Sequence, residues 1–389
     1  MKKTLLKLIC LALAVALMVP CFASCGEKTI EVPSFSDDTI KIGASGPLTG
    51  GAAVYGQAVN NGAKLAVYEI NEAGGLDGIK LSFEMFDDQH NANMVSTGYA
   101  SLYEKGMQVS LGCVTSAPCL EYVKLSKQDN VFFLTPSASA DKVPAEANGY
   151  QMCFADGNQG AVAAEYVNSL NLSSIGIFYK SDDPYSTGIY EQFKQKLNSS
   201  VSTVEASFLG EATDFTAQVD KLKGCSFIFM PIYYGPASLF MTQAIGKVDA
   251  KAVYYGCDGF DGIESAEGFD ISAVPQKVQM LSHFNSKAES GAAKVFVDDY
   301  TEYFGTDTLN QFGAAAYDCV YAIYNALKAA KAAGKTVDAS TSASDMCEIL
   351  KEQFNGGFTY SGVTGENIKW ESTGYVNKGA VAYVIKEAN

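Results

Sequence analysis

The sequence predicts an α/β protein made of two doubly wound parallel-sheet lobes, and two observations lead to this prediction. From residue 40 onward, short apolar runs alternate with turns and amphipathic helical stretches. This alternation is typical of βαβ units and of a parallel sheet covered by helices on both faces. The folded part is also about 350 residues long, which is too many for one ordinary core and suits two domains.

The expected elements follow one another regularly. Strands are predicted at 40–44, 80–86, 108–112, 131–134, 174–179, 225–230 and 252–256. Helices are predicted between them at 57–71, 93–105, 119–128, 158–170, 186–198, 213–222 and 236–246. The alternation then stops, because two long helices at 287–304 and 310–333 follow one another before strands at 366–370 and 379–385.

The first residues have the composition of a secretory signal. Three lysines precede an unbroken apolar run at 8–19, so residues 1–24 are assigned to a signal peptide. The run is too short to span a bilayer, and no later segment reaches the roughly 20 apolar residues that a membrane helix needs. The segment Phe22-Ala23-Ser24-Cys25 resembles a bacterial lipobox, in which the cysteine is diacylated. Cys25 is therefore expected to anchor an exported protein to the outer face of the cytoplasmic membrane, with residues 25–39 as a spacer. Ordinary cleavage without lipidation is the alternative.

Charge excludes several classes of partner. The chain carries 43 acidic and 28 basic residues, and every basic residue is a lysine. Nucleic acids and other polyanions are poor partners for such a chain. Without arginine, a bidentate clamp for phosphate or a dicarboxylate is not possible. A ligand carboxylate must then be held by hydroxyls, backbone N–H groups, helix N-termini or a lysine.

The cysteines do not form a metal-binding pattern. After the leader and Cys25, seven remain, and none form a Cys-x-x-Cys pair with metal-ligand spacing. They are interpreted as small buried apolar residues, with a Cys113–Cys119 disulfide as the alternative. The seven are Cys113, Cys119, Cys153, Cys225, Cys257, Cys319 and Cys347.

Two loops at strand ends carry hydroxyls and almost no charge. In a parallel α/β sheet, ligands bind beyond the carboxyl ends of the strands. Thr115 and Ser116 follow one strand and precede a helix, and Ser137 and Ser139 follow the next strand. Hydroxyls at a helix N-terminus suit a carboxylate, although capping of the helix by Ser116 is an equally ordinary role. The pair of loops favours a small zwitterion over a polyanion.

An amino acid also needs an acceptor for its ammonium group. Asp258 lies just past the strand at 252–256 and is placed to supply it, with a simple Asp-Gly turn as the alternative. Tyr55, Tyr185 and Tyr233 lie near equivalent strand ends and suit the apolar walls of a cleft. Catalysis finds little support, because His90 and His283 are the only histidines and neither lies in a nucleophile or metal motif. No cofactor or metal is expected.

Several motifs, taken as an ordered set, resemble the branched-chain amino-acid-binding proteins of ABC importers. The resemblance covers about residues 40–385. Its motifs are Ile42-Gly43-Ala44-Ser45-Gly46-Pro47-Leu48-Thr49-Gly50, Tyr55-Gly56, Ile70-Asn71-Glu72-Ala73-Gly74-Gly75, Phe86-Asp87-Asp88, Thr135-Pro136-Ser137-Ala138-Ser139, Asp156-Gly157-Asn158-Gln159-Gly160, Asp183-Pro184-Tyr185-Ser186-Thr187-Gly188 and Thr213-Asp214-Phe215.

The resemblance implies a type I periplasmic-binding fold, with two α/β lobes joined by three crossovers and one amino acid enclosed between them. Lobe 1 would comprise residues 40–157 and 285–357, and lobe 2 residues 158–284 and 358–389. The crossovers would lie near 156–160, 281–285 and 355–360.

The resemblance also assigns site residues. Thr115, Ser116 and Ser139 match positions that hold the ligand carboxylate. The Ser137 carbonyl, the Ser139 hydroxyl and Asp258 match the ammonium site. The side-chain pocket and cleft walls match Tyr55, Tyr185, Tyr233 and Phe312.

Two positions depart from the family pattern. Asp258 stands where typical branched-chain binders have glutamate, which leaves the identity of the ligand open. A disulfide present in some relatives is not reproduced, because His90 and Thr115 occupy the matching positions.

The implied function is that of a monomeric lipoprotein that captures a neutral, branched-chain amino acid and delivers it to an ABC permease. A ligand sensor on the same fold and an amide-hydrolysing enzyme are the alternatives.

Overall fold

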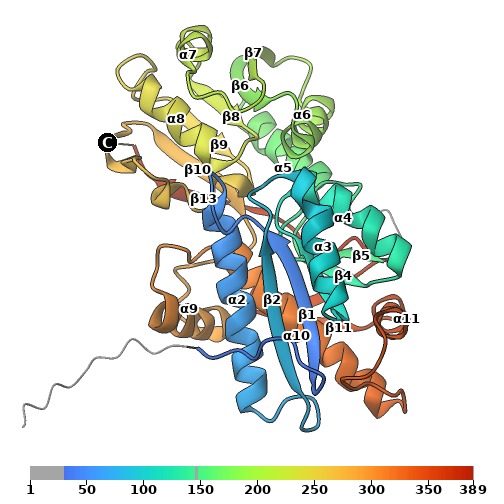
Figure 1. Cartoon of the computed structure of the whole chain (residues 1–389). Coiled ribbons are helices and arrows are strands. Elements are labelled where there is room, and N and C mark those ends of the chain that lie inside the picture. Colours follow the sequence, from blue (N-terminus) through green and yellow to red (C-terminus); the bar gives the residue numbers. More distant parts are fainter. Residues whose placement is uncertain (1–29, 145–147, 389) are drawn as a thin grey trace, which may run out of the picture.

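Two α/β sheets form the framework of the computed structural model, which describes residues 30–144 and 148–388 (Figure 1). The strands of the first sheet are β1 (Thr39–Gly46), β2 (Lys80–Asp87), β3 (Val109–Cys113), β4 (Phe133–Thr135) and β5 (Gly149–Gln151). Those of the second are β6 (Ser174–Lys180), β7 (Ser202–Phe208), β8 (Phe227–Met230), β9 (Val253–Gly256), β10 (Lys277–Ser282) and β13 (Val381–Lys386). A separate hairpin pairs β11 (Thr359–Gly362) with β12 (Gly365–Lys369).

The strand order shows a doubly wound topology in each sheet. The first sheet has the order β2-β1-β3-β4-β5, and the second β13-β10-β9-β8-β6-β7. All pairs in both sheets are parallel except the antiparallel pair β10–β13. The elements built on the first sheet are called lobe 1 and those built on the second are called lobe 2.

Helices cover both faces of each sheet. In lobe 1, α2 and α10 bury one face, and α3 and α4 bury the other. In lobe 2, α5 and α6 cover one face, and α7 and α8 the other. Their bounds, with those of the two remaining helices, are α2 (Ala53–Glu72), α3 (Val95–Glu104), α4 (Ser116–Asp129), α5 (Asp156–Ser169), α6 (Pro184–Lys196), α7 (Thr216–Leu222), α8 (Tyr234–Ala244), α9 (Gly291–Phe304), α10 (Gln311–Ala332) and α11 (Ala343–Asn355). The predicted fold class is confirmed.

Every helix and strand expected from the sequence is present with shifted ends, but five elements were missed. They are β5, β7, β10, β11 and α11. β5 has only three residues, and β7 lies at a sheet edge where Ser202, Thr203 and Glu205 leave it half exposed. Such edge strands lack the continuous apolar run that marks a central parallel strand.

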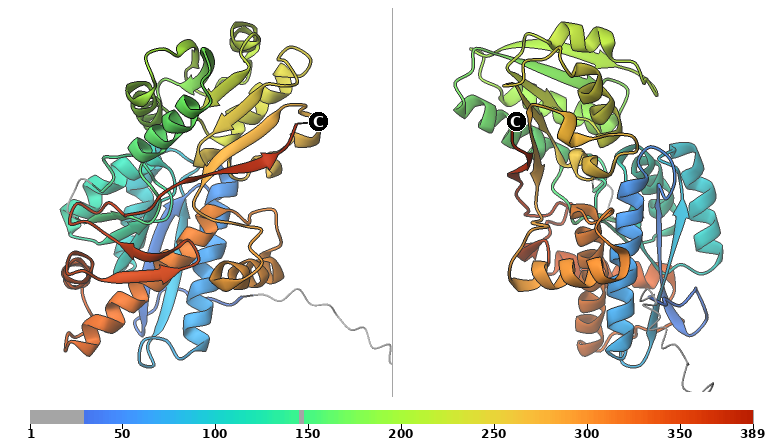
Figure 2. Two further views of the ribbon diagram at one scale, coloured as in Figure 1. Left: turned by 180° about the vertical axis from the view of Figure 1, so that it is seen from behind. Right: turned by 90° about the vertical axis from the view of Figure 1, so that its left-hand side faces the viewer.

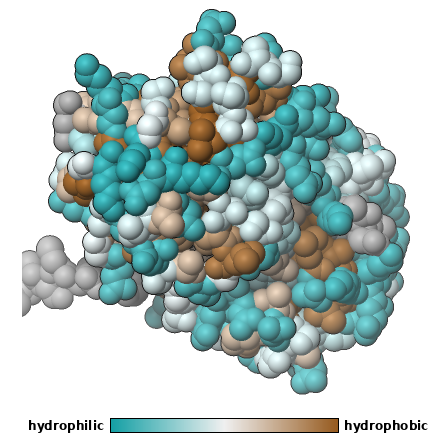
Figure 3. All heavy atoms as spheres, turned by 90° about the horizontal axis from the view of Figure 1, so that it is seen from above, coloured by the Kyte–Doolittle hydropathy of each residue, from teal (hydrophilic) through white to brown (hydrophobic). Residues whose placement is uncertain are grey.

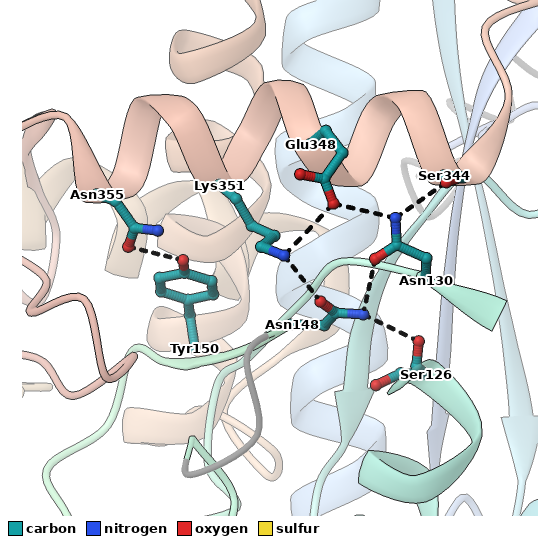
Figure 4. Close-up of polar contacts among 8 residues, drawn as sticks. All are labelled: Ser126, Asn130, Asn148, Tyr150, Ser344, Glu348, Lys351 and Asn355. Atoms are coloured by element: carbon teal, nitrogen blue, oxygen red, sulfur yellow. Dashed lines mark hydrogen bonds and ion pairs between the residues drawn. The ribbon is translucent and has the colours of Figure 1, made fainter. Parts of the chain in front are cut away.

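The missed helix α11 is attached to lobe 1 by an apolar stripe and a polar network. Met346, Cys347, Leu350 and Phe354 are buried at helical spacing. Figure 4 shows the polar side: the Lys351 ammonium binds the Asn148 carbonyl oxygen at 3.3 Å. The other contacts in this network join Lys351 to Glu348, Asn130 to Ser344 and Glu348, and Asn148 to Asn130 and Ser126. A separate bond joins Tyr150 to Asn355.

The third crossover differs from its predicted position. The hairpin 359–369, assigned to lobe 2 by the sequence, lies on lobe 1 instead. The Tyr360 hydroxyl donates to Asp318 of α10 at 2.8 Å, and the Trp370 ring lies 4.6 Å from that of Phe354. The hairpin buries its apolar side on lobe 1, and only β13 pairs with lobe 2. The chain therefore crosses between Lys378, whose ammonium binds Thr364 of the hairpin, and β13. Figure 2 shows this last segment running from lobe 1 to lobe 2.

A buried lysine lies at this third crossover. Lys378 is 9 % exposed, and its ammonium donates to the Thr364 hydroxyl at 2.6 Å. Asp318, which is fully buried, accepts from the backbone N–H groups of Val363 and Thr364 at 2.8 and 2.7 Å. Burial lowers the pKa of Lys378 to about 8, although the nearby Asp318 carboxylate acts in the opposite direction.

The surface seen from above is mainly polar. The face seen over lobe 2 is largely hydrophilic, with apolar residues in separate patches (Figure 3). Exposed large apolar side chains in lobe 2 include Leu209, Leu239 and Ile245, and scattered residues of this kind are normal on soluble surfaces. Within residues 30–144 and 148–388, no helix is long and apolar enough to cross a membrane.

We expect Lys378 to make the free energy of unfolding rise with pH above about 8. The unfolded chain keeps the lysine proton up to the ordinary pKa of 10.5, whereas the folded protein releases it near 8. Over this window the unfolded state binds more protons, so this group adds up to about 1.4 kcal/mol of stability per pH unit. Urea unfolding between about pH 7.5 and 9.5 measures the effect.

The matched control is Lys369→Met, which removes an exposed lysine of the hairpin that Lys378 contacts and should keep the wild-type pH dependence. Lys378→Met should remove the rise, so the stability difference between wild type and this variant changes with pH. A pH-independent difference would contradict the assignment.

Candidate functional site

The candidate site lies between the lobes, at the carboxyl ends of strands from both sheets. All nine site residues predicted from the sequence, except Ser116 and Ser139, line one small cavity there. Its volume of about 10 Å³ has room for about one water molecule. The lobes are therefore closed on each other. The lining residues are Tyr55, Val114, Thr115, Ser137, Tyr185, Tyr233, Asp258, Gly259 and Phe312.

On lobe 1, the N-terminus of α4 points toward the site. Thr115 is the N-cap residue, with extended backbone angles, and Ser116 is the first residue of the helix. The Ser116 hydroxyl accepts from the N–H of Ala140 at 3.2 Å and does not cap its own helix. The capping interpretation of Ser116 is therefore wrong. The N-cap side chain makes no bond to the first turn, and Thr115 itself lines the cavity, so the N-terminus of α4 lies at the cleft.

The loop after β4 is tied to the loop after β3. The Thr135 hydroxyl donates to the carbonyl oxygen of Cys113 at 2.8 Å, and the Ser137 hydroxyl donates to that of Val114 at 2.6 Å. Ser139 is 1 % exposed, and its backbone carbonyl accepts from the N–H of Asp156 at 2.8 Å. Its hydroxyl lies beside the Asp156 carboxylate but makes no hydrogen bond of good geometry among the described residues. These contacts bring together the two hydroxyl-bearing loops that the sequence singled out.

On lobe 2, Asp258 begins a short 3₁₀ turn directly after β9. Its carboxylate accepts from the Tyr185 hydroxyl at 2.7 Å, and its N–H donates to the Gln159 side-chain carbonyl at 3.1 Å. Asp258 is 2 % exposed, and burial raises its pKa to about 6, with the bond from Tyr185 opposing the shift. In the described part of the chain, no ion pair involves this carboxylate.

A second buried carboxylate, Asp156, was not assigned a role from the sequence. It is the first residue of α5 and is 1 % exposed. Neither carboxylate oxygen has a hydrogen-bond partner in the described residues. Burial raises the pKa of Asp156 well above its ordinary value, and the nearby Asp258 adds to the shift. The residue stood in the motif 156–160, but no sequence signal showed that its side chain would be buried beside Asp258.

Aromatic side chains close the cavity. The rings of Tyr185 and Tyr233 are stacked with centroids 4.4 Å apart, and Tyr55 meets Phe312 edge to face at 4.9 Å. The Tyr55 hydroxyl also donates to the carbonyl oxygen of Gly259 and accepts from the N–H of Tyr234 at 3.1 Å. Because Tyr55 belongs to lobe 1 and its partners to lobe 2, it joins the closed lobes as well as forming a wall.

Other site predictions have simple outcomes. The seven cysteines that follow Cys25 are free and buried, so the predicted apolar interpretation is confirmed and the Cys113–Cys119 disulfide is absent. Among residues 30–144 and 148–388, no group of three or more potential ligands could hold a metal ion. Cys25 and the signal peptide lie outside the described residues.

Residues 39–387 match the family model for periplasmic binding proteins. The chain belongs to this family. The resemblance drawn from the motifs is thereby confirmed, and membership implies a location outside the cytoplasm.

Curated relatives of this periplasmic binding protein are named for amino acids. The leucine-, isoleucine-, valine-, threonine- and alanine-binding protein of Pseudomonas aeruginosa is 28 % identical over 62 % of this chain and 64 % of its own length. The Leu/Ile/Val-binding protein of Escherichia coli is 26 % identical over 60 % of this chain and 67 % of its own length. The matches to the first curated relatives span slightly less than two thirds of those proteins' lengths.

Solved structures are similar over most of the chain. The branched-chain amino acid transporter substrate-binding protein LivJ from Streptococcus pneumoniae, in complex with isoleucine, is 26 % identical with a TM-score of 0.77. The match covers 90 % of this chain and 99 % of LivJ. The leucine-binding protein LivK from Thermotoga maritima is 23 % identical with a TM-score of 0.75, over 90 % of this chain and 96 % of LivK, which supports the fold.

We expect Ser116 and Ser139 to differ in their effects on stability. Ser116→Ala should lower the free energy of unfolding by about 1–3 kcal/mol, because the buried N–H of Ala140 loses its acceptor. Ser139→Ala is the matched control and should change it little, because its hydroxyl makes no internal hydrogen bond of good geometry. Urea unfolding of protein purified without amino acids tests this. An equal loss of unfolding free energy in the two variants would contradict this prediction.

Proposed function

We propose that this protein captures one neutral amino acid between its lobes outside the cytoplasm and delivers it to an ABC permease. The observation that carries the proposal is the polarity of the cleft. Hydroxyls and the N-terminus of α4 lie on lobe 1, and the carboxylates of Asp156 and Asp258 lie on lobe 2. An amino acid zwitterion has charges of the signs that these two sides favour.

The lobe 1 side suits the ligand carboxylate. Thr115, Ser116 and Ser139 supply hydroxyls, and the first turn of α4 supplies N–H groups at the positive end of the helix dipole. None of these groups carries a full positive charge. Neutral donors of this kind suit a single carboxylate, and the described residues that line the cavity offer no lysine for a second one on a longer acidic ligand.

The lobe 2 side suits the ligand ammonium. The proposed acceptors are the Asp258 carboxylate of lobe 2, with Asp156 close by, and the Ser137 carbonyl and Ser139 hydroxyl, which face it from lobe 1. Removing two carboxylates from water costs free energy, and a bound ammonium offsets part of this cost. This explains why the described residues place acids here without a lysine partner.

The walls suit an apolar side chain. Tyr55, Tyr185, Tyr233 and Phe312 surround the cavity with ring surfaces. Leucine, isoleucine and valine are therefore the first candidates, in line with the names of the relatives. Because the closed cavity holds about one water, a ligand of this size requires the lobes or the rings to move apart, as in a hinge motion selected by contacts with both lobes.

The remaining parts of the proposal concern the setting. The protein is proposed to act as a monomer, tethered through a diacylated Cys25 beside the permease, and to have no catalytic activity. Binding without chemistry is supported by the absence of a nucleophile or metal motif in the sequence.

A thermal-shift screen across the neutral amino acids tests the ligand class. A ligand present at 100 times its dissociation constant should add about 2.7 kcal/mol of stability. We expect the largest shifts with branched-chain amino acids and none with glutamate or nucleotides. A flat response to all neutral amino acids would overturn the proposed function while leaving the fold unaffected.

Asp258→Asn should weaken binding of the best ligand by about 3–5 kcal/mol, because the substitution removes the charge that pairs with a buried ammonium. Wild-type affinity should also fall as the pH drops through about 6, where the free protein protonates Asp258. The variant should lose the part of this fall that Asp258 causes. Isothermal titration calorimetry between about pH 5 and 7.5 measures both effects.

Asp220→Asn, at an exposed position of α7, is the control and should bind like wild type. Binding by Asp258→Asn within threefold of wild type would sink the ammonium assignment.

A further inference from the structure

His90 lies at the junction between the lobes, and none of the roles described above involves its side chain. It lies in the loop between β2 and α3, where Gln89 and His90 both have left-handed backbone angles, with φ of 53° and 60°. Residues other than glycine adopt this conformation at a cost, so the surrounding structure must hold it. The Asp88 carboxylate does so by accepting from the N–H of His90 at 2.9 Å and from the Ser45 hydroxyl of β1 at 2.8 Å.

One nitrogen of the His90 ring contacts the ligand-facing end of α4. Nδ1 lies 2.8 Å from the hydroxyl oxygen of Thr115, which is 2 % exposed and lines the cavity. Thr115 makes no side-chain bond to its own helix. The orientation of its hydroxyl is therefore set by His90.

The ring of His90 also contacts lobe 2. It meets the ring of Tyr233 nearly perpendicularly, with centroids 5.3 Å apart and an interplanar angle of 85°. Tyr233 stacks on Tyr185, whose hydroxyl binds Asp258. A continuous series of contacts thus runs from Thr115 on the carboxylate side of the cleft to Asp258 on the ammonium side.

We propose that His90 is a positioning residue for amino acid binding: it orients the Thr115 hydroxyl and seats Tyr233 when the lobes close. The proposal rests on the proposed function. Residues 90 and 115 are the positions that form a disulfide in some relatives. In this chain His90 and Thr115 replace that disulfide with a polar contact that can titrate.

The groups around His90 favour its neutral form in the closed protein. Burial lowers the pKa of His90, Lys180 of lobe 2 acts in the same direction, and Glu211 of lobe 2 opposes it. Within its own loop, Asp88 is directed at the backbone N–H rather than the ring. The facing groups Thr115 and Tyr233 are uncharged. Lowering the pH through the ordinary value of 6.5 should therefore favour the open lobes and weaken ligand binding through this residue.

A double-mutant cycle tests the hydrogen bond to Thr115. The ligand is the amino acid that gives the largest thermal shift, and affinity is measured by calorimetry at about pH 7.5. Thr115→Val should weaken binding about fivefold in wild type, as expected for one hydrogen bond, but less than about twofold in His90→Phe. The control is Thr187→Val on α6, whose effect should be the same in both backgrounds. Equal effects of Thr115→Val in both backgrounds would overturn the proposal.

His90→Asn provides a second test in case the phenylalanine variant does not fold. Asparagine tolerates left-handed backbone angles and has a polar atom close to the position of Nδ1, but it has no ring and does not titrate. The affinity of this variant should be within about threefold of wild type near pH 7.5. Between about pH 7.5 and 5.5, its affinity should fall by a factor at least about threefold smaller than the factor for wild type. A pH profile identical to wild type would overturn the proposal. If no amino acid binds the wild-type protein, the proposed function fails instead.

Discussion

The burial of two carboxylates, Asp156 and Asp258, in the cleft between the lobes is the constraint on which the site depends. Neither has a cationic partner in the described part of the chain, and burial raises the pKa of both. Such groups cost stability unless donors surround them. Tyr185 supplies one donor to Asp258 and lobe 1 faces the pair with hydroxyls. The arrangement is understandable as a site kept ready for a cation that also carries a carboxylate.

Closure of the lobes is maintained by contacts that also form the site. Tyr55 reaches from α2 to two backbone groups of lobe 2, and Gln311 at the start of α10 donates its N–H to Asp261 of lobe 2 at 2.9 Å. Because the walls of the cavity are made by the residues that join the lobes, ligand contact and lobe closure are coupled. This coupling is what a protein needs to present one face to a transporter only when it is loaded.

The sequence was a good guide to elements with strong apolar patterns and a poor one to weakly patterned elements. The central strands and long helices were predicted because buried parallel strands and amphipathic helices carry continuous signals. β7 was missed because it mixes polar and apolar residues at a sheet edge. α11 was missed although its buried residues recur at helical spacing, so here the pattern was present in the sequence and was overlooked. The hairpin 359–369 was placed in the wrong lobe, because its few apolar residues can pack on either core. Only the folded chain shows that Tyr360 binds Asp318 of α10 and that Trp370, just after the hairpin, meets Phe354.

The sequence by itself determined the α/β class, the two-lobed organisation and the loops that carry the site. Residue patterns at strand ends are local, and strand ends in a parallel sheet meet at one edge. Only the tertiary structure decided that Asp156 lies buried near Asp258, that Ser116 binds the N–H of Ala140, and that His90 joins Thr115 to Tyr233. These contacts link segments far apart in the chain, and their partners depend on how the lobes approach each other. No local sequence pattern encodes how the two lobes approach each other.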